Sequence, residues 1–118
     1  MINLRIALDK LLEEFHERVF FQSASKGTQF PYIVYTLPNS FTVEEQEIFV
    51  LDVDVWDNKE DTMELETLSS DIWKGLNRYH HYDKNIQFSV YRTNRLPLDD
   101  DDPTIKRRKL IFELKYYD

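Results

Sequence analysis

The sequence feature that most constrains the fold is an alternating stretch, Ile48–Trp56, that runs into an amphipathic segment, Leu65–Tyr79. One side of the first stretch is apolar throughout: Phe49, Leu51, Val53 and Val55. The other side begins apolar and becomes acidic: Ile48, Val50, Asp52, Asp54 and Trp56. A period of two with many β-branched residues predicts a half-buried strand at the centre of the fold.

The segment after this strand has the period of a helix. Asp57–Asp61 breaks the alternation, and Asp61 with Glu64 has the spacing of a capping box, with Asp in place of Ser or Thr. Apolar residues then recur every three or four positions: Leu65, Leu68, Ile72, Leu76 and Tyr79. This stripe predicts a helix that packs on the sheet.

Composition bounds the class of protein. With 118 residues, 42% of them hydrophobic, the chain is expected to form one domain, residues 1–118, and not a disordered segment. It has no cysteine and only two glycines, which leaves no thiolate metal site and no glycine-rich phosphate loop. No apolar run approaches a membrane span, and a net charge of −7 opposes nonspecific nucleic-acid binding. We expect a soluble intracellular domain without a cofactor.

The remaining segments complete an α+β pattern. Apolar spacing predicts a first helix over Asn3–Arg18, and alternation predicts a strand over Phe30–Leu37. Phe41–Gln46 is interpreted as a loop or wide hairpin turn before the central strand, and His80–Asn85 as a connector.

Two more strands are predicted in the C-terminal part, over Ile86–Thr93 and Lys106–Tyr117, separated by an acidic loop, Asn94–Thr104. The expected order is therefore α-β-β-α-β-β. Such an order favours one mostly antiparallel sheet packed with two helices.

The most conspicuous polar feature is a run of four carboxylates, Asp99, Asp100, Asp101 and Asp102. Carboxylate oxygens suit Ca²⁺ or Mg²⁺, but Pro103 falls where an EF-hand requires an oxygen ligand, and no glycine follows. A solvated loop is the simpler interpretation, so no metal site is predicted.

A basic run follows the carboxylates closely: Lys106, Arg107, Arg108 and Lys109. It is too short and too near the acidic run to form a nucleic-acid surface. Adjacent blocks of opposite charge instead favour contacts between copies of one chain, because the acid of one copy can meet the base of the next. Both runs are candidate interface residues.

Two residue patterns in the sequence have features of a catalytic or metal site. Glu113 and Lys115 have the spacing of the acidic-x-Lys half of a Mg²⁺-dependent nuclease site, for which the Asp99–Asp102 run would supply the second carboxylate. The simpler interpretation places both on the solvent face of a terminal strand. Adjacent His80 and His81 point apart and lack a third ligand. The sequence therefore predicts no catalytic residue.

Aromatic residues outnumber what one small core can bury, with eight Phe, seven Tyr and two Trp. Surface aromatics are enriched at protein–protein contacts. Phe41 and Trp56 are the aromatic interface candidates, and the chain is better equipped for assembly than for catalysis.

The arrangement of these segments resembles the tail terminator, or tail completion, proteins of long-tailed bacteriophages and prophages. The features that carry the resemblance are the N-terminal helix Leu4–Phe15, the strand Phe30–Tyr35, and the module Phe49–Asp57 running into the helix Leu65–Leu76. A closing strand follows an irregular loop. The resemblance covers most of the chain and is one of pattern, length and element order.

The resemblance implies a structural, non-enzymatic protein. Such proteins form a ring, typically a hexamer, that caps the tail tube and joins it to the head connector protein. They assemble in the cytoplasm of the bacterial host and end in the virion tail. Partners would be further copies of the chain, the tail tube protein and the head connector, with no specific nucleic-acid binding and no membrane. The loops 39–46 and 94–104 would face neighbours, tube or lumen.

Three alternatives remain open at this point. A connector adaptor or stopper protein is similarly small and ring-forming. A Mg²⁺-dependent nuclease would use Glu113, Lys115 and the acidic run. An intracellular binding domain would work as a dimer.

Overall fold

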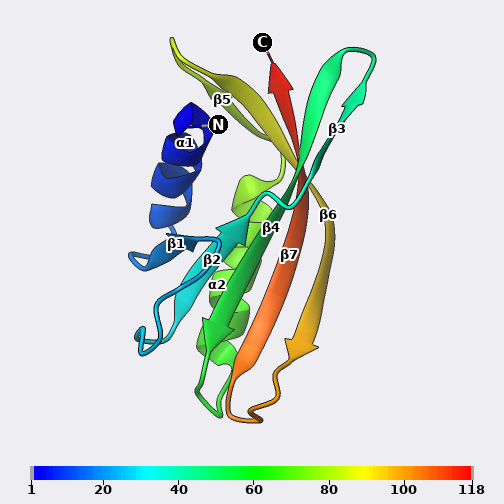
Figure 1. Cartoon of the computed structure of the whole chain (residues 1–118). Helices are drawn as coiled ribbons and strands as arrows, with labels where there is room; N and C mark the ends of the chain where they lie inside the picture. The colour runs from blue at the N-terminus through cyan, green and yellow to red at the C-terminus, as the bar shows by residue number, and fades with distance from the viewer. Residues whose placement is uncertain (1, 118) are drawn as a thin grey trace.

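In the computed structural model, which describes residues 2–117, seven strands form one twisted sheet and two helices pack against one of its faces (Figure 1). The elements are α1 (Ile2–Glu13), β1 (Val19–Phe21), β2 (Tyr32–Thr36), β3 (Ser40–Val43), β4 (Gln46–Asp57), α2 (Met63–Leu76), β5 (Tyr79–Tyr82), β6 (Gln87–Asp99) and β7 (Lys106–Tyr117). The strand order is β1-β2-β4-β7-β6-β5, and β3 pairs with the first part of β4. Among the strand pairs formed within residues 2–117, only β1 and β2 are parallel. The predicted α+β class is confirmed.

Strand β4 is the organising element, as its alternation predicts. Along Glu47–Asp57 it pairs with β7, and on its other edge it pairs first with β3 and then, over Asp52–Trp56, with β2. Leu51, Val53 and Val55 have no exposed surface. The opposite side of the strand faces away from both helices, so the two faces of β4 have different chemistry.

The core lies between the sheet and the two helices. Helix α2 contributes four residues of the predicted stripe, whereas the fifth, Tyr79, lies beyond the end of the helix in β5. Helix α1 contributes a leucine-rich face. The fully or nearly fully buried core residues of the helices are Leu4, Leu8, Leu11, Leu12, Leu65, Leu68, Ile72 and Leu76. Each buried leucine or isoleucine contributes about 1.5–3 kcal/mol relative to an exposed one. Packing of this face, more than intrinsic propensity, therefore holds both short helices in place.

Helix α1 is shorter than predicted, ending at Glu13 instead of Arg18. The residues after it are drawn into the sheet. The Arg18 carbonyl accepts a hydrogen bond from the Ile33 amide at 2.9 Å, and the Arg18 Nε donates to the Pro31 carbonyl at 3.0 Å. Val19–Phe21 then continues as β1 beside β2. Sheet pairing thus outcompetes the last helical turn.

The predicted capping box of α2 is wrong. Thr62 occupies the N-cap position without a side-chain cap hydrogen bond. Asp61 instead accepts from the Met63 amide at 3.0 Å, and Glu64 forms an ion pair with Lys59. Glu64, the second residue of the predicted capping box, therefore pairs with Lys59 of the preceding loop and does not bond the backbone at the start of the helix.

Two segments predicted as loops or connectors contain strands. Ser40–Val43 forms β3, which pairs with β4 around a two-residue turn, Glu44–Glu45. Tyr79–Tyr82 forms β5 on the edge of β6. Each of these short strands gains its hydrogen bonds from a long neighbour, and its own sequence has no alternation strong enough to predict it.

Strand β6 continues six residues beyond the predicted end at Thr93, to Asp99. The register shifts between Arg92 and Asn94, which marks a β-bulge, and pairing with β7 resumes as far as Asp99 opposite Lys106. The bulge inverts the alternation, so one sequence pattern cannot describe both halves of the strand. Half of the predicted acidic loop is therefore strand.

The molecule is elongated, with extents of 45 × 23 × 23 Å. The β3–β4 hairpin and the β5–β6 turn project at one end, and the β6–β7 turn lies at the other (Figure 1). Within residues 2–117, neither helix combines the length and apolarity needed to cross a membrane.

Candidate functional site: the helix-free face of the sheet

The sheet face away from the helices carries an ordered arrangement of charged and aromatic side chains. In an antiparallel pair, directly opposed residues point to the same face, so the register defines two rows across this surface. One row is Val34, Asp54, Lys109 and Leu96. The next is Tyr32, Trp56, Arg107 and Leu98.

Asp52, Asp54, Arg107 and Lys109 form an ion network, here called the ion ladder. Arg107 Nε donates to Asp54 Oδ1 at 3.1 Å, and Lys109 Nζ lies 3.1 Å from Asp52 Oδ2 and 3.3 Å from Asp54 Oδ2. Asp54 is only 6% exposed. Ionised groups this buried are retained only when paired, so the ladder depends on all of its members.

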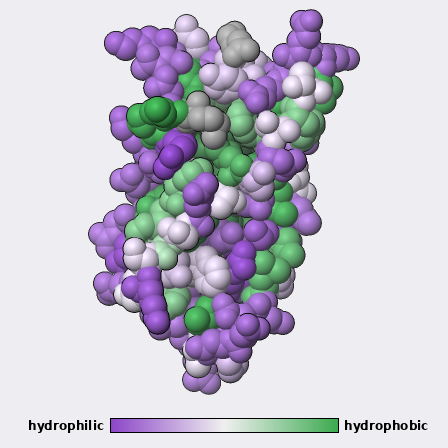
Figure 2. Space-filling model, in the orientation of Figure 1, coloured by the Kyte–Doolittle hydropathy of each residue, from purple (hydrophilic) through white to green (hydrophobic). Residues whose placement is uncertain are grey.

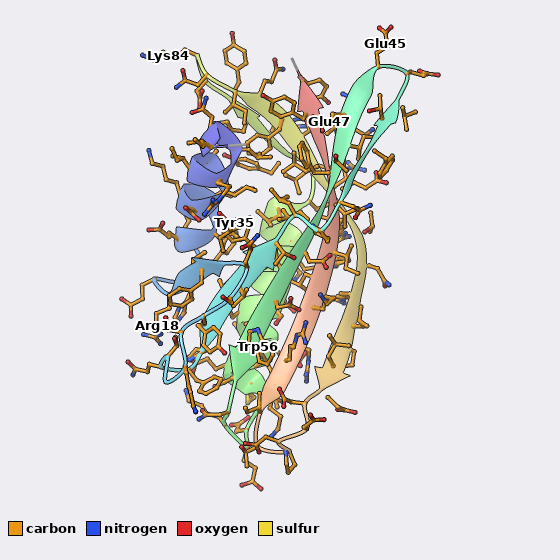
Figure 3. The ribbon with its side chains drawn as sticks, viewed as in Figure 1. Arg18, Tyr35, Glu45, Glu47, Trp56 and Lys84 are labelled. Carbon is orange, nitrogen blue, oxygen red and sulfur yellow. The ribbon has the colours of Figure 1, made fainter. Side chains whose placement is uncertain are left out.

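An aromatic stack continues the ladder towards the sheet edge. The rings of Tyr32 and Trp56 lie nearly parallel, with centroids 6.1 Å apart, and the Arg107 guanidinium lies 4.7 Å from the Trp56 ring centroid. Figure 3 shows Trp56 on the side of β4 that faces away from α2. Burial raises the pKa of the Tyr32 hydroxyl above its ordinary value.

A shallow cavity of about 390 Å³ lies above the ladder, between the sheet and the loop that follows β1. Its walls are Gln22, Ser23, Ala24, Tyr32, Val34, Thr36, Asp54, Trp56, Arg107 and Lys109. The view of this face shows apolar and polar groups interspersed, with hydrophilic side chains gathered at the two ends (Figure 2). A mixed surface of this kind suits contact with a protein better than enclosure of a small molecule.

The structure separates the four residues of the basic run. Arg107 and Lys109 belong to the ion ladder, whereas Lys106 and Arg108 point to the other face. Arg108 Nε lies 2.6 Å from Glu66 Oε1 on α2, and Lys106 Nζ donates to the Pro103 carbonyl at 3.1 Å. The run therefore has partners within its own chain, and its predicted role between copies stays a prediction.

The acidic run forms the turn between β6 and β7. Asp99 is the last residue of β6, and the Asp100 carboxylate accepts from the Asp102 amide at 3.1 Å. Asp102 accepts from the Thr104 amide and hydroxyl, and these hydrogen bonds lower the pKa of its carboxyl. The carboxylates thus serve the turn locally. No group of three or more potential ligands in residues 2–117 has metal-binding geometry.

The residues of the nuclease alternative are far apart. Glu113 pairs with Tyr91 and Asp99 with Lys106, seven positions apart along β7. At 3.3 Å per residue this separation is about 23 Å, too long for two carboxylates to share one Mg²⁺. Strand β7 is the last strand of the chain, as predicted, and Glu113 and Lys115 are partly exposed on its face away from the core. The structure offers nothing in favour of this alternative.

The two aromatic candidates differ in setting. Trp56 is half-buried in the stack with Tyr32 and Arg107, whereas Phe41 is 41% exposed on β3. The predicted presence of aromatics at the surface is therefore correct for Phe41. Sequence reasoning named Trp56 and the basic run but missed the ladder that joins them, because the pairing of Asp54 with Lys109 depends on a register that no local signal records.

Comparison with known proteins rests on structure alone. No family model matches the sequence, and no curated protein matches it. A solved chain from the virion of a native gene transfer agent particle has a similar fold, with a TM-score of 0.69 and 7% sequence identity. The likeness covers 98% of this chain and 90% of the other. At this identity the comparison establishes a shared fold across the whole domain.

Proposed function

We propose that this protein is a structural component of a phage-like particle, a tail terminator that forms a ring, caps the tail tube and joins it to the head connector. The observation that carries the proposal is the whole-chain likeness to a chain from a gene transfer agent virion. The likeness extends over both helices and the entire sheet, so a chance match to one supersecondary unit does not account for it.

Three features of the molecule support a role in assembly over one in catalysis. Within residues 2–117, no group of three or more potential metal ligands comes together. The helix-free face is a mixed polar and aromatic surface, and apolar side chains are exposed on the projecting hairpin. These are properties of surfaces that bind other proteins.

The acidic character of the chain fits a ring through which DNA passes. A net charge of −7 repels phosphates, so DNA would slide along such a lumen without being held. A hexamer would multiply this charge around the channel. A connector adaptor or stopper protein would share these properties and differ in binding the head side only.

The test is the effect of the purified protein on growth of the tail tube. The tail tube protein of the same particle is allowed to polymerise with and without this chain, and the products are imaged by electron microscopy. We expect rings on tube ends and a tube length that shortens as the chain is added. Binding to the head connector with no effect on tube growth would favour the adaptor or stopper, and no binding to either would refute the proposal.

A further inference from the structure

The β3–β4 hairpin, Ser40–Glu47 (the acidic hairpin), exposes apolar groups beside unpaired carboxylates. Phe41 and Val43 are 41% and 49% exposed and point to the same face of the hairpin. Glu44 and Glu45 form its tip, and neither makes an ion pair within residues 2–117. Figure 3 shows Glu45 at the end of the hairpin, directed away from the body of the molecule.

The turn of this hairpin is held in an unfavourable backbone conformation. Glu44 and Glu45 have φ angles of 49° and 69°, in the left-handed region that glycine and asparagine prefer at such turns. Two glutamates at these positions add charge where Asn-Gly would give a more stable turn.

On the helix side of the sheet, a groove of about 410 Å³ (the basic groove) separates α2 from the outer half of β6. Its walls are Glu66, Ser69, Ser70, Arg95, Leu96, Pro97, Arg108, Lys109 and Leu110. The groove lies between the first half of α2 and the paired segments Arg95–Pro97 of β6 and Arg108–Leu110 of β7.

The rim of the basic groove carries cations without carboxylate partners. The guanidinium groups of Arg92 and Arg95 each lie 5.2 Å from the Trp73 ring centroid. Neither pairs with an acid within residues 2–117. Arg95 and Pro97 are exposed. In a chain of net charge −7, this is a local surface of the opposite sign.

The backbone beside the groove also has a free edge. Strand β5 pairs with β6 only along Gln87–Val90, and the Arg92 amide donates to Asn77 Oδ1 at 3.2 Å, so Thr93–Asp99 has no strand partner on its outer side among the described residues. Pro97 interrupts this edge, which limits continuous strand addition. A short partner that contacts side chains as well as backbone suits the edge better than a long strand.

The acidic hairpin cannot reach the basic groove of its own chain. Leu110 in the groove pairs with Val53, and Gln46 of the hairpin lies seven positions from Val53 along β4. The intervening distance is about 23 Å along a rigid strand. An acidic, apolar projection and a basic, apolar groove on the same chain, held this far apart, can meet only between copies.

We propose that the acidic hairpin of one copy docks in the basic groove of the next copy. Such a contact is heterologous, because each copy uses a different surface for each neighbour, and it closes into a ring if the rotation per copy divides a full turn. The inference rests on the proposed function and deepens it, since it assigns the contact that builds the ring.

Reciprocal charge reversal tests the contact. Arg95→Glu and Glu45→Arg should each weaken assembly at least about tenfold in midpoint concentration, measured by light scattering, because each places like charges across the contact. Mixing the two variants should restore assembly, since every contact then pairs opposite charges in an alternating ring. The matched controls are Lys84→Glu and Glu60→Arg, both at exposed positions outside the contact.

The outcomes of this experiment separate the possibilities. Rescue on mixing, together with assembly of both controls, would support the hairpin-in-groove contact. Loss of assembly in a single variant without rescue on mixing would overturn it, as would assembly of both variants at the wild-type midpoint. A circular dichroism spectrum and melting temperature matching wild type show that each variant is folded.

Disulfide trapping provides a second measurement that detects weak contacts, because the chain has no cysteine of its own. Val43→Cys on one copy and Ser70→Cys on another should form a mixed disulfide under mild oxidation. Ser25→Cys, on the exposed loop after β1, replaces Ser70→Cys in the control pair. Equal yields from the two pairs would contradict the proposal.

Failure of this inference can be distinguished from failure of the proposed function. Rings that cap the tail tube while both charge variants assemble normally would leave the terminator function in place and move the contact elsewhere. Conversely, specific trapping and rescue without any effect on the tail tube would keep the contact and refute the terminator role.

Discussion

The two faces of the central sheet are stabilised by different physical effects. On the helix side, Leu51, Val53, Val55 and Phe112 are entirely buried among apolar neighbours. On the other side, the same strands carry the ion ladder, in which Asp54 is nearly as buried but depends on Arg107 and Lys109. Apolar packing tolerates changes of shape by partial relaxation, whereas a buried charge tolerates no loss of its partner.

The two faces therefore contribute differently to folding. The apolar face supplies most of the driving force, because the hydrophobic effect scales with the area removed from water. The ion ladder contributes specificity of register, since a slip of one residue along β7 would move Lys109 and Arg107 to the opposite face. The helix-free face is thus polar enough to remain exposed to water or to bind a protein partner.

The largest loss of stability is expected from removing a large apolar side chain on the helix-covered face of the sheet. Phe112→Ala should lower the free energy of unfolding by about 3–5 kcal/mol, because it leaves a cavity beneath Trp73 and α2. The adjacent Ile111→Ala, on the helix-free face, should cost about 1 kcal/mol. Urea titration followed by circular dichroism measures both, and equal losses would show that the two faces are equally packed.

Removal of the shared carboxylate tests the other face. Asp54→Ala should lower the free energy of unfolding by about 2–3 kcal/mol, because Arg107 and Lys109 lose their common partner. The loss should fall below the 3–5 kcal/mol typical of fully buried pairs, since both cations are partly exposed. Asp71→Ala, at an exposed position on α2, is the control and should be close to neutral.

A smaller loss of stability is expected when a polar group that lies within the helix-covered face is removed. The Tyr35 hydroxyl donates to Asp9 Oδ1 and lies 3.2 Å from the Arg5 carbonyl, so it ties β2 to α1. Tyr35→Phe should therefore cost about 1 kcal/mol at neutral pH. Tyr82→Phe, at an exposed position, should cost nothing measurable and serves as the control.

The same substitution has a pH signature. Burial, followed by the hydrogen bond to Asp9, raises the pKa of Tyr35 above its ordinary value of 10. The folded state therefore keeps the proton, while the unfolded state releases it above pH 10, so this contribution to stability is lost as pH rises from 10 towards the folded-state pKa. The difference in unfolding free energy between wild type and Tyr35→Phe should shrink or change sign over that window, and a constant difference would contradict the assignment.

The sequence predicts the buried residues of the helix-covered face, but it does not predict the ion ladder on the other face. The alternation of β4 and the stripe of α2 arise from burial itself, so Leu51, Val53, Leu65 and Ile72 were correctly predicted as core. The same reasoning left Asp52 and Asp54 as surface carboxylates. Their burial follows from the register of β4 against β7, which places Lys109 opposite Asp54.

Strands β3 and β5 and the second half of β6 escaped prediction for a related reason. Each is stabilised by hydrogen bonds to the adjacent, longer strand and not by a pattern of its own, and the bulge at Arg92 and Asn94 inverts the pattern within β6. The turn at Glu44–Glu45 also lacks the Asn-Gly or Asp-Gly pair by which such hairpins are recognised. A hairpin built without its usual turn residues gives no local signal.

The hairpin tip, Glu44–Glu45, lies between β3 and β4 and is stabilised by neither face of the sheet, so the sign of the effect should reverse there. Glu45→Gly should raise the free energy of unfolding by up to about 1 kcal/mol, because glycine adopts the φ of 69° without the steric cost borne by glutamate. Glu13→Gly, at the exposed end of α1, is the control and should destabilise. If Glu45→Gly both stabilises the monomer and weakens assembly, the residue is retained for its charge at the contact. If it destabilises the monomer, the side chain of Glu45 supports the hairpin itself, and the distinction between a stability-bearing sheet and an interaction-bearing tip fails.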